Sequence, residues 1–276
     1  MLEVFGRDIW ISNGSAVEVF GFHYPTRMAV IRLFGGGLFI WSPIPLSDTL
    51  RSKVDALGPV QHIVAPNSLH HLSVPDWQKA YPKAKVYAPP KLGKKRKDIK
   101  FDDDLQENPN SGWDGEIDQV IVRGNLITTE VVFFHTKSGT VLFTDLIQQF
   151  PDSWFSGWRR VVAKLDLMIS PEPSVPRKFR MAFTNRRAAR ASIERIFNWP
   201  AQKVLMAHGT PVTSDAKAYI RRAFIWLSRK FQRLPFQRLD HIYPRPVTTT
   251  FETGRQERIH DVKRQPFTHH TRASLG

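Results

Sequence analysis

Two adjacent histidines end a short polar motif that directly follows an apolar segment. Residues 60–65 read VQHIVA, and residues 66–71 read PNSLHH. A loop lets successive side chains turn toward one point, whereas side chains along a strand alternate between its two faces. Imidazole nitrogens bind zinc, iron and related divalent ions. His70 and His71 are therefore candidate metal ligands.

Two further candidate ligands occur in similar sequence contexts. Asp145 lies in or at the end of the apolar segment 140–147, TVLFTDLI, where an uncompensated carboxylate is costly to bury. His208 follows residues 203–206, KVLM, and precedes Gly209. Three strand-to-loop junctions, each with a side chain that binds metals, are what a site along one sheet edge requires.

Each of these residues also has a simpler explanation. Adjacent histidines occur by chance, and a non-metal role is at least as common for them. An aspartate at a strand end often caps a turn or a helix. A loop histidine such as His208 more often forms a hydrogen bond than binds a metal. It is the order of the four residues along the chain that favours a shared site.

The elements that would position these residues alternate between strands and helices. We expect a hairpin of strands 28–34 and 38–41 around Gly35, Gly36 and Gly37, because a glycine turn between apolar runs favours one. Helical spacing in 47–57 predicts a helix that Ser47 or Asp48 caps. Further strands are expected at 17–22, 60–65, 85–88, 120–122, 128–135, 140–147 and 203–206, and helices at 74–81, 154–162, 177–197 and 215–227. Residues 165–169 fit a strand or a helix. The order predicts an α/β fold.

This order of elements and residues resembles the metallo-β-lactamase fold superfamily. The hairpin, the helix over 47–57 and the strand VQHIVA correspond to the opening of that fold, LFTD to the strand ending in its bridging aspartate, and LMAHG to its final strand and histidine. The resemblance covers roughly residues 15 to 227. It implies a four-layer αβ/βα sandwich (α/β, or α+β) with a metal site at one edge of its sheets.

The metal-binding motif departs from that of the superfamily. The superfamily has His-x-His-x-Asp-His; with His71 on its last histidine, Pro66 and Ser68 replace the first two. The Asp-x-Gly that follows the hairpin in the superfamily corresponds here to Ser-Pro-Ile at residues 42–44. Residues 120–124, where the third histidine of the first metal site is expected, contain no histidine. The resemblance therefore implies that the first metal site is absent and that one divalent ion, zinc, iron or manganese, is held by the second. Its ligands would be His70, His71, Asp145 and His208, in a degenerate branch with a Pro-Asn-x-x-His-His motif.

Such a site predicts hydrolysis of an ester, thioester, amide or phosphodiester. A bound divalent ion lowers the pKa of water toward neutrality, and Asp145 is the candidate catalytic residue that orients this water or takes its proton. Asn67 and Glu130 are the candidates for supporting the ligands. A turn at 137–139 places Glu130 closer than His135 to Asp145 in the neighbouring strand, although an exposed strand carboxylate is the commoner explanation of Glu130. Loss of the first metal site is equally compatible with loss of catalysis.

The composition limits the compartment and the partners. The 276 residues include 40 Lys and Arg against 25 Asp and Glu, a net charge of +15, which favours anionic partners. The absence of cysteine excludes disulfides, thiolate metal sites and a cysteine nucleophile. No secretory leader and no run of about 18 apolar residues occur, so we expect an intracellular, cytoplasmic protein without a transmembrane segment.

Three functions therefore remain open. The first is a metal-dependent hydrolase acting on a small, anionic molecule. The second is a non-catalytic member of the fold that binds a ligand or a partner through its basic surface. The third is association with nucleic acid through residues 91–100 and 177–195, although such charged runs are usually solvated and no dedicated nucleic-acid motif accompanies them. We expect residues 1–227 to form the metallo-β-lactamase-like domain and residues 228–276 a basic, irregular extension.

Overall fold

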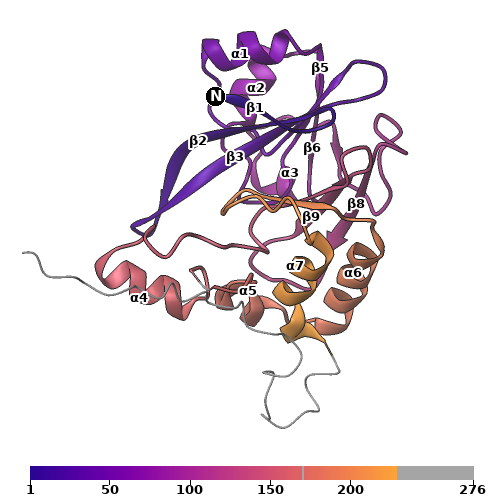
Figure 1. Cartoon of the computed structure of the whole chain (residues 1–276). Coiled ribbons are helices and arrows are strands. Elements are labelled where there is room, and N and C mark those ends of the chain that lie inside the picture. The colour runs from indigo at the N-terminus through magenta and orange to yellow at the C-terminus, as the bar shows by residue number, and fades with distance from the viewer. Residues whose placement is uncertain (170, 229–276) are drawn as a thin grey trace, which may run out of the picture. The chain divides into compact units, whose positions relative to one another are not determined.

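A computed structural model describes residues 1–169 and 171–228 (Figure 1). Apart from Ser228, the predicted extension over 228–276 lies outside the described residues. Within the described ranges, no helix combines the length and the apolar character needed to cross a bilayer.

The larger sheet has seven strands in sequence order, from β1 at one edge to β7 at the other. The first four strands pair antiparallel, and β4 to β7 run parallel. Its strands are β1 (Leu2–Gly6), β2 (Ile9–Val19), β3 (Phe22–Arg32), β4 (Leu38–Trp41), β5 (Val60–Val64), β6 (Lys85–Ala88) and β7 (Asp103–Asp104). Parallel strands end at the same edge, so the residues after β4, β5 and β6 lie side by side.

The smaller sheet has four strands in the order β11-β10-β9-β8. Strands β8, β9 and β10 pair antiparallel, while β10 and β11 are parallel. The strands are β8 (Ile117–Val122), β9 (Glu130–His135), β10 (Thr140–Phe143) and β11 (Lys203–Met206). The pairing of Thr140 with His135 agrees with the turn expected at 137–139.

Three apolar cores separate four layers. One lies between the two sheets and contains Ile31, Phe39 and Val64 of the larger sheet with Phe133 and Leu205 of the smaller. A second packs the other face of the larger sheet against α1 (Asp48–Asp55) and α2 (Val74–Ala80). The third packs the smaller sheet against α5 (Arg177–Ala182), α6 (Arg186–Asn198) and α7 (Ala216–Ala223). The αβ/βα sandwich expected from the sequence is therefore confirmed.

Several elements differ from the sequence prediction for local reasons. The expected strand 17–22 is two strands, because Phe20 (φ 51°) and Gly21 (φ 77°) form a two-residue turn between β2 and β3. The expected helix 177–197 is divided into α5 and α6, because the Asn185 side chain accepts a hydrogen bond from Ala188 N (3.0 Å) and starts a new helix.

Three other segments also have different bounds. The basic segment 91–100 contains the short helix α3 (Leu92–Lys95), and the helix expected at 154–162 is α4 (Gly157–Leu165), which leaves 166–169 without a strand. The helix expected at 215–227 is α7 followed by a 3-10 turn, Ile225–Leu227. Ser47 is the cap of α1, since its hydroxyl accepts a hydrogen bond from Leu50 N (3.2 Å).

Candidate metal centre

The register of β10 and β11 places Asp145 beside His208. Phe143 pairs with Met206 at the ends of these parallel strands, and Ala207 N donates to the Phe143 carbonyl (3.0 Å). Asp145 and His208 each follow their strand end by two residues. Side chains at equivalent positions beyond two parallel strands are neighbours, so the pairing alone brings this carboxylate and this imidazole together.

The motif at 66–71 reaches the same place from the larger sheet. Pro66 O accepts a hydrogen bond from Val131 N (2.8 Å), which fixes the start of the loop to β9. The Asn67 Oδ1 accepts from Leu69 N (2.8 Å) and His70 N (2.9 Å), and this turn directs His70 toward the smaller sheet.

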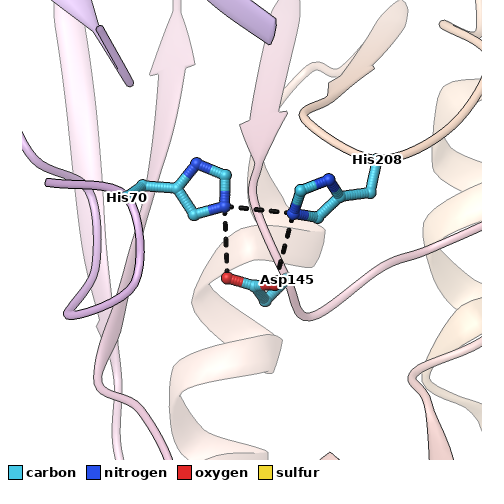
Figure 2. A group of neighbouring side chains, drawn as sticks. All are labelled: His70, Asp145 and His208. Atoms are coloured by element: carbon cyan, nitrogen blue, oxygen red, sulfur yellow. Dashed lines mark hydrogen bonds and ion pairs between the residues drawn. The ribbon is translucent and has the colours of Figure 1, made fainter. Parts of the chain in front are cut away.

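Three side chains converge at this edge (Figure 2). His70 Nε2 lies 3.1 Å from His208 Nε2. The two Asp145 oxygens lie 3.3 Å from His70 Nε2 and 3.4 Å from His208 Nε2. All three candidate ligand atoms lie within 4.8 Å of one another. A metal at bond lengths of about 2.1 Å in tetrahedral geometry has ligand atoms roughly 3.4 Å apart, so the spacing suits one small ion.

Hydrogen bonds on the far side of each ring orient the imidazoles. His208 Nδ1 lies 2.7 Å from Pro25 O, a carbonyl that only accepts, so Nδ1 carries the proton and a neutral ring keeps its lone pair on Nε2. His70 Nδ1 lies 2.8 Å from Ser42 Oγ. Metal-binding histidines are commonly held in this way. The Ser42 hydroxyl can accept from Nδ1–H of His70, which leaves the lone pair of His70 on Nε2 as well; in that tautomer both Nε2 atoms can bind one cation, so the donor set fits a metal ion.

Burial and charge favour the protonation states that bind metal. Burial alone would raise the pKa of Asp145, but the neighbouring His70 and His208 hold it well below its ordinary value. Burial lowers the pKa of His70, and Asp145 opposes this only in part. A neutral imidazole and an ionised carboxylate are the forms that act as ligands.

The two predicted supporting residues both act on Asp145. Asn67 Nδ2 donates to Asp145 Oδ2 (2.7 Å) and to Thr144 Oγ1 (2.8 Å), so one amide connects the histidine loop to the carboxylate. Glu130 is fully buried, not an exposed strand carboxylate. Its oxygens accept the backbone N–H groups of residues 144, 145 and 146 at 2.8, 2.8 and 3.0 Å. These bonds end the strand at Phe143 and fix the backbone of Asp145.

The fourth predicted ligand, His71, is not part of the three-residue cluster. Burial lowers the pKa of His71, and the charge of Arg96 lowers it further. Among residues 1–169 and 171–228, no second group of three such donor residues comes together. The two residues at the positions of the missing first-site histidines make other contacts. Pro66 O accepts a hydrogen bond from Val131 N, and the Ser68 hydroxyl lies 3.2 Å from Thr128 Oγ1.

Sequence reasoning did not identify three of the groups that complete the site. Ser42 directly follows β4, whose parallel neighbour β5 leads into the histidine loop, so its position after the strand was an available signal. Gln148 Nε2 contacts Asp145 Oδ1 (3.3 Å) and lies three residues beyond it in sequence. The Pro25 carbonyl has no sequence signal, because any residue supplies a carbonyl.

Two aromatic rings flank His208, and a lysine contacts one of them. The Tyr24 ring packs edge-on against it, with centroids 5.5 Å apart, and Phe150 stacks at 6.3 Å. Lys178 Nζ lies 3.0 Å from the Tyr24 hydroxyl and 3.6 Å from Asp166. This side of the site is therefore apolar near the imidazole and carries a cation at its margin.

The sequence matches the profile of one protein family. The profile of a family described as a domain of unknown function, DUF4336, matches residues 8–166, more than half of the sequence. The chain belongs to this family. No curated protein sequence matches it.

Solved structures resemble the DUF4336 chain over most of its length. DIM-1 metallo-β-lactamase is 17% identical, with a TM-score of 0.57 over 83% of this chain and 97% of its own. A metallo-β-lactamase from Pontibacter korlensis is 11% identical, with a TM-score of 0.55 over 83% and 99%. The Flv1 flavodiiron core from Synechocystis sp. PCC6803 is 11% identical, with a TM-score of 0.57 over 84% and 61%. The protein therefore has the metallo-β-lactamase fold.

Proposed function

We propose that this DUF4336 protein is a hydrolase with a single divalent metal ion held by His70, Asp145 and His208. The observation that carries the proposal is the convergence of two imidazole Nε2 atoms and one carboxylate within 4.8 Å. Two nitrogen donors and one oxygen donor suit zinc, iron or manganese. When bound, such an ion supplies a Lewis acid that makes water nucleophilic near neutral pH.

Other steps of the hydrolysis would depend on side chains around the metal. Asp145 Oδ2 is engaged by Asn67 at 2.7 Å, whereas Oδ1 has only the longer 3.3 Å contact with Gln148. Oδ1 is therefore the oxygen that would orient the attacking water or take its proton. Tyr24 and Phe150 would exclude bulk water beside His208.

Metal-dependent hydrolysis tests the proposal. Protein purified without chelator would be assayed against small anionic esters, thioesters and phosphodiesters before and after metal removal. We expect hydrolysis of at least one class, lost with the metal and restored by zinc, iron or manganese. Asp145→Asn should abolish it, while His23→Ala, at an exposed histidine outside the cluster, should leave it unchanged. Activity that survives chelation would contradict the proposal.

The second candidate is a protein that holds the ion without catalysis. Both Asp145 oxygens already have hydrogen-bond donors, as expected of a carboxylate whose only task is to bind metal. Metal-loaded protein inactive on every substrate class would support this alternative. The basic segments give nucleic acid less support, because Arg96 pairs with Asp98 and Arg195 with Glu107.

A further inference from the structure

Helix α4 turns its apolar side chains away from the protein. Trp158, Val161 and Leu165 are 57%, 59% and 60% exposed, and Val162 is also exposed. Their spacing places them on one face of the helix. Ala163 is the buried residue of α4 and contacts the core beneath. A helix that packs on a protein core normally buries such a face, so this one is free to contact something else.

The tip of the β2–β3 hairpin lies beside α4 (Figure 1). Arg159 Nε donates to Gly21 O (2.6 Å), and the Phe22 and Trp158 rings pack with centroids 5.5 Å apart. Phe20, at the turn, is 94% exposed. The α4 surface, as we call it, consists of the exposed residues Val19, Phe20, Trp154, Trp158, Val161, Val162 and Leu165.

Cationic side chains border the apolar residues of the α4 surface. Helix α4 contains Arg159, Arg160 and Lys164 and no acidic residue. Arg160 pairs with Asp152, and the Arg159 guanidinium lies 4.9 Å from the centre of the Trp158 ring. Glu18 of β2 is the acidic residue nearest the hairpin tip in sequence. Asp166 follows the helix and pairs with Lys178, so among the described residues Arg159 and Lys164 are the cations of α4 without an ion-pair partner.

We propose that the α4 surface binds the interface of an anionic lipid bilayer. Short helices with an apolar face and basic flanks lie in the headgroup region, where their binding increases with both apolar area and anionic charge. Tryptophan is enriched at this depth because its ring is apolar and its indole N–H is polar. Basic residues near an anionic leaflet add to the attraction.

Charge disfavours two other occupants of the α4 surface, a second copy of this chain and residues 229–276 of the same chain. A second copy docking through the same surface would bring the unpaired Arg159 and Lys164 of both chains together, and like charges repel. Residues 229–276 contain ten lysine and arginine residues against four aspartate and glutamate residues, so this part of the chain is also positive. An anionic lipid surface complements the border.

Vesicle binding by the full chain tests this proposal independently of the metal. Binding to phosphatidylcholine vesicles with and without phosphatidylserine would be measured by co-sedimentation, comparing wild type with the triple variant Trp158→Gln, Val161→Gln, Leu165→Gln. These substitutions keep the charge, so we expect binding to anionic vesicles to fall roughly 10- to 100-fold. Circular dichroism should show an unchanged fold, because all three side chains are exposed.

A matched control separates this surface from general apolar exposure. Phe34 is also 94% exposed but follows the opposite end of β3, so Phe34→Gln should bind vesicles like wild type. Equal binding by wild type and the triple variant, no preference for anionic vesicles, or no binding by wild type would each overturn the proposal. So would a wild-type dimer that the triple variant abolishes, seen by sedimentation velocity.

Discussion

Replacing Asn67 by alanine should weaken both the fold and the metal site. The buried Asn67 amide makes four hydrogen bonds: two from backbone N–H groups and two to Thr144 Oγ1 and Asp145 Oδ2. A neutral hydrogen bond contributes about 1 kcal/mol and one to a charged group about 1.5–3 kcal/mol. Three neutral bonds and one to the Asp145 carboxylate should therefore lower the free energy of unfolding by about 4.5–6 kcal/mol.

The same substitution should lower metal affinity about 10- to 100-fold, because Asn67 orients the Asp145 carboxylate and the His70 loop together. Urea denaturation would measure stability, and competition with a chromophoric chelator would measure affinity. Asn125 is the matched control: its Oδ1 accepts two backbone N–H groups and its Nδ2 donates to Phe179 O, but it has no contact with Asp145. Asn125→Ala should cost stability and leave metal affinity unchanged. Unchanged affinity in Asn67→Ala, or an equal loss in both variants, would refute the reasoning.

Three further predictions concern Glu130, Ser42 and His62. Glu130→Gln places an amide N–H against a backbone N–H, so thermal denaturation should show a loss of about 2–3 kcal/mol; an unchanged melting temperature would contradict this. Ser42→Ala removes the partner of His70 Nδ1 and should weaken metal binding about 10-fold without loss of fold; full affinity would show that the contact is dispensable.

The third prediction concerns how the stability of the fold depends on pH. Burial, with a smaller contribution from Lys85, lowers the pKa of His62 to about 4, whereas an unfolded histidine titrates near 6.5. The unfolded state then binds more protons, so stability is lost as pH falls from about 6.5 toward 4, by about 2 kcal/mol at about pH 5. His62→Leu should reduce this slope without abolishing it, because burial also lowers the pKa of His135 to about 4; the same slope in both proteins would exclude His62 as a source.

Much of the site could be predicted because strand ends carry information. Asp145 and His208 each follow a short apolar segment, and parallel pairing of β10 and β11 is enough to bring them together. Asn67 and His70 lie in one polar motif after β5. The layered fold could also be predicted, because the order of strands and helices determines which faces must be covered.

Other features depend on contacts between distant residues. The strand expected over 140–147 ends at Phe143 because the Glu130 side chain takes the next three backbone N–H groups. Ser42 contacts His70 only because β4 lies beside β5. Adjacent histidines cannot be ranked from sequence, and the loop turn made by Asn67 is what directs His70 rather than His71 into the cluster. The exposed face of α4 likewise depends on what packs around it.

Metal content in a pair of neighbouring variants tests the central claim most directly. Wild type, His70→Ala and His71→Ala would be purified without chelator, loaded with one metal and analysed by elemental mass spectrometry. The geometry predicts one equivalent per chain in wild type and in His71→Ala, and none in His70→Ala, because only His70 lies in the cluster with Asp145 and His208. A metal-free wild type, or metal retained in His70→Ala and lost in His71→Ala, would contradict the account.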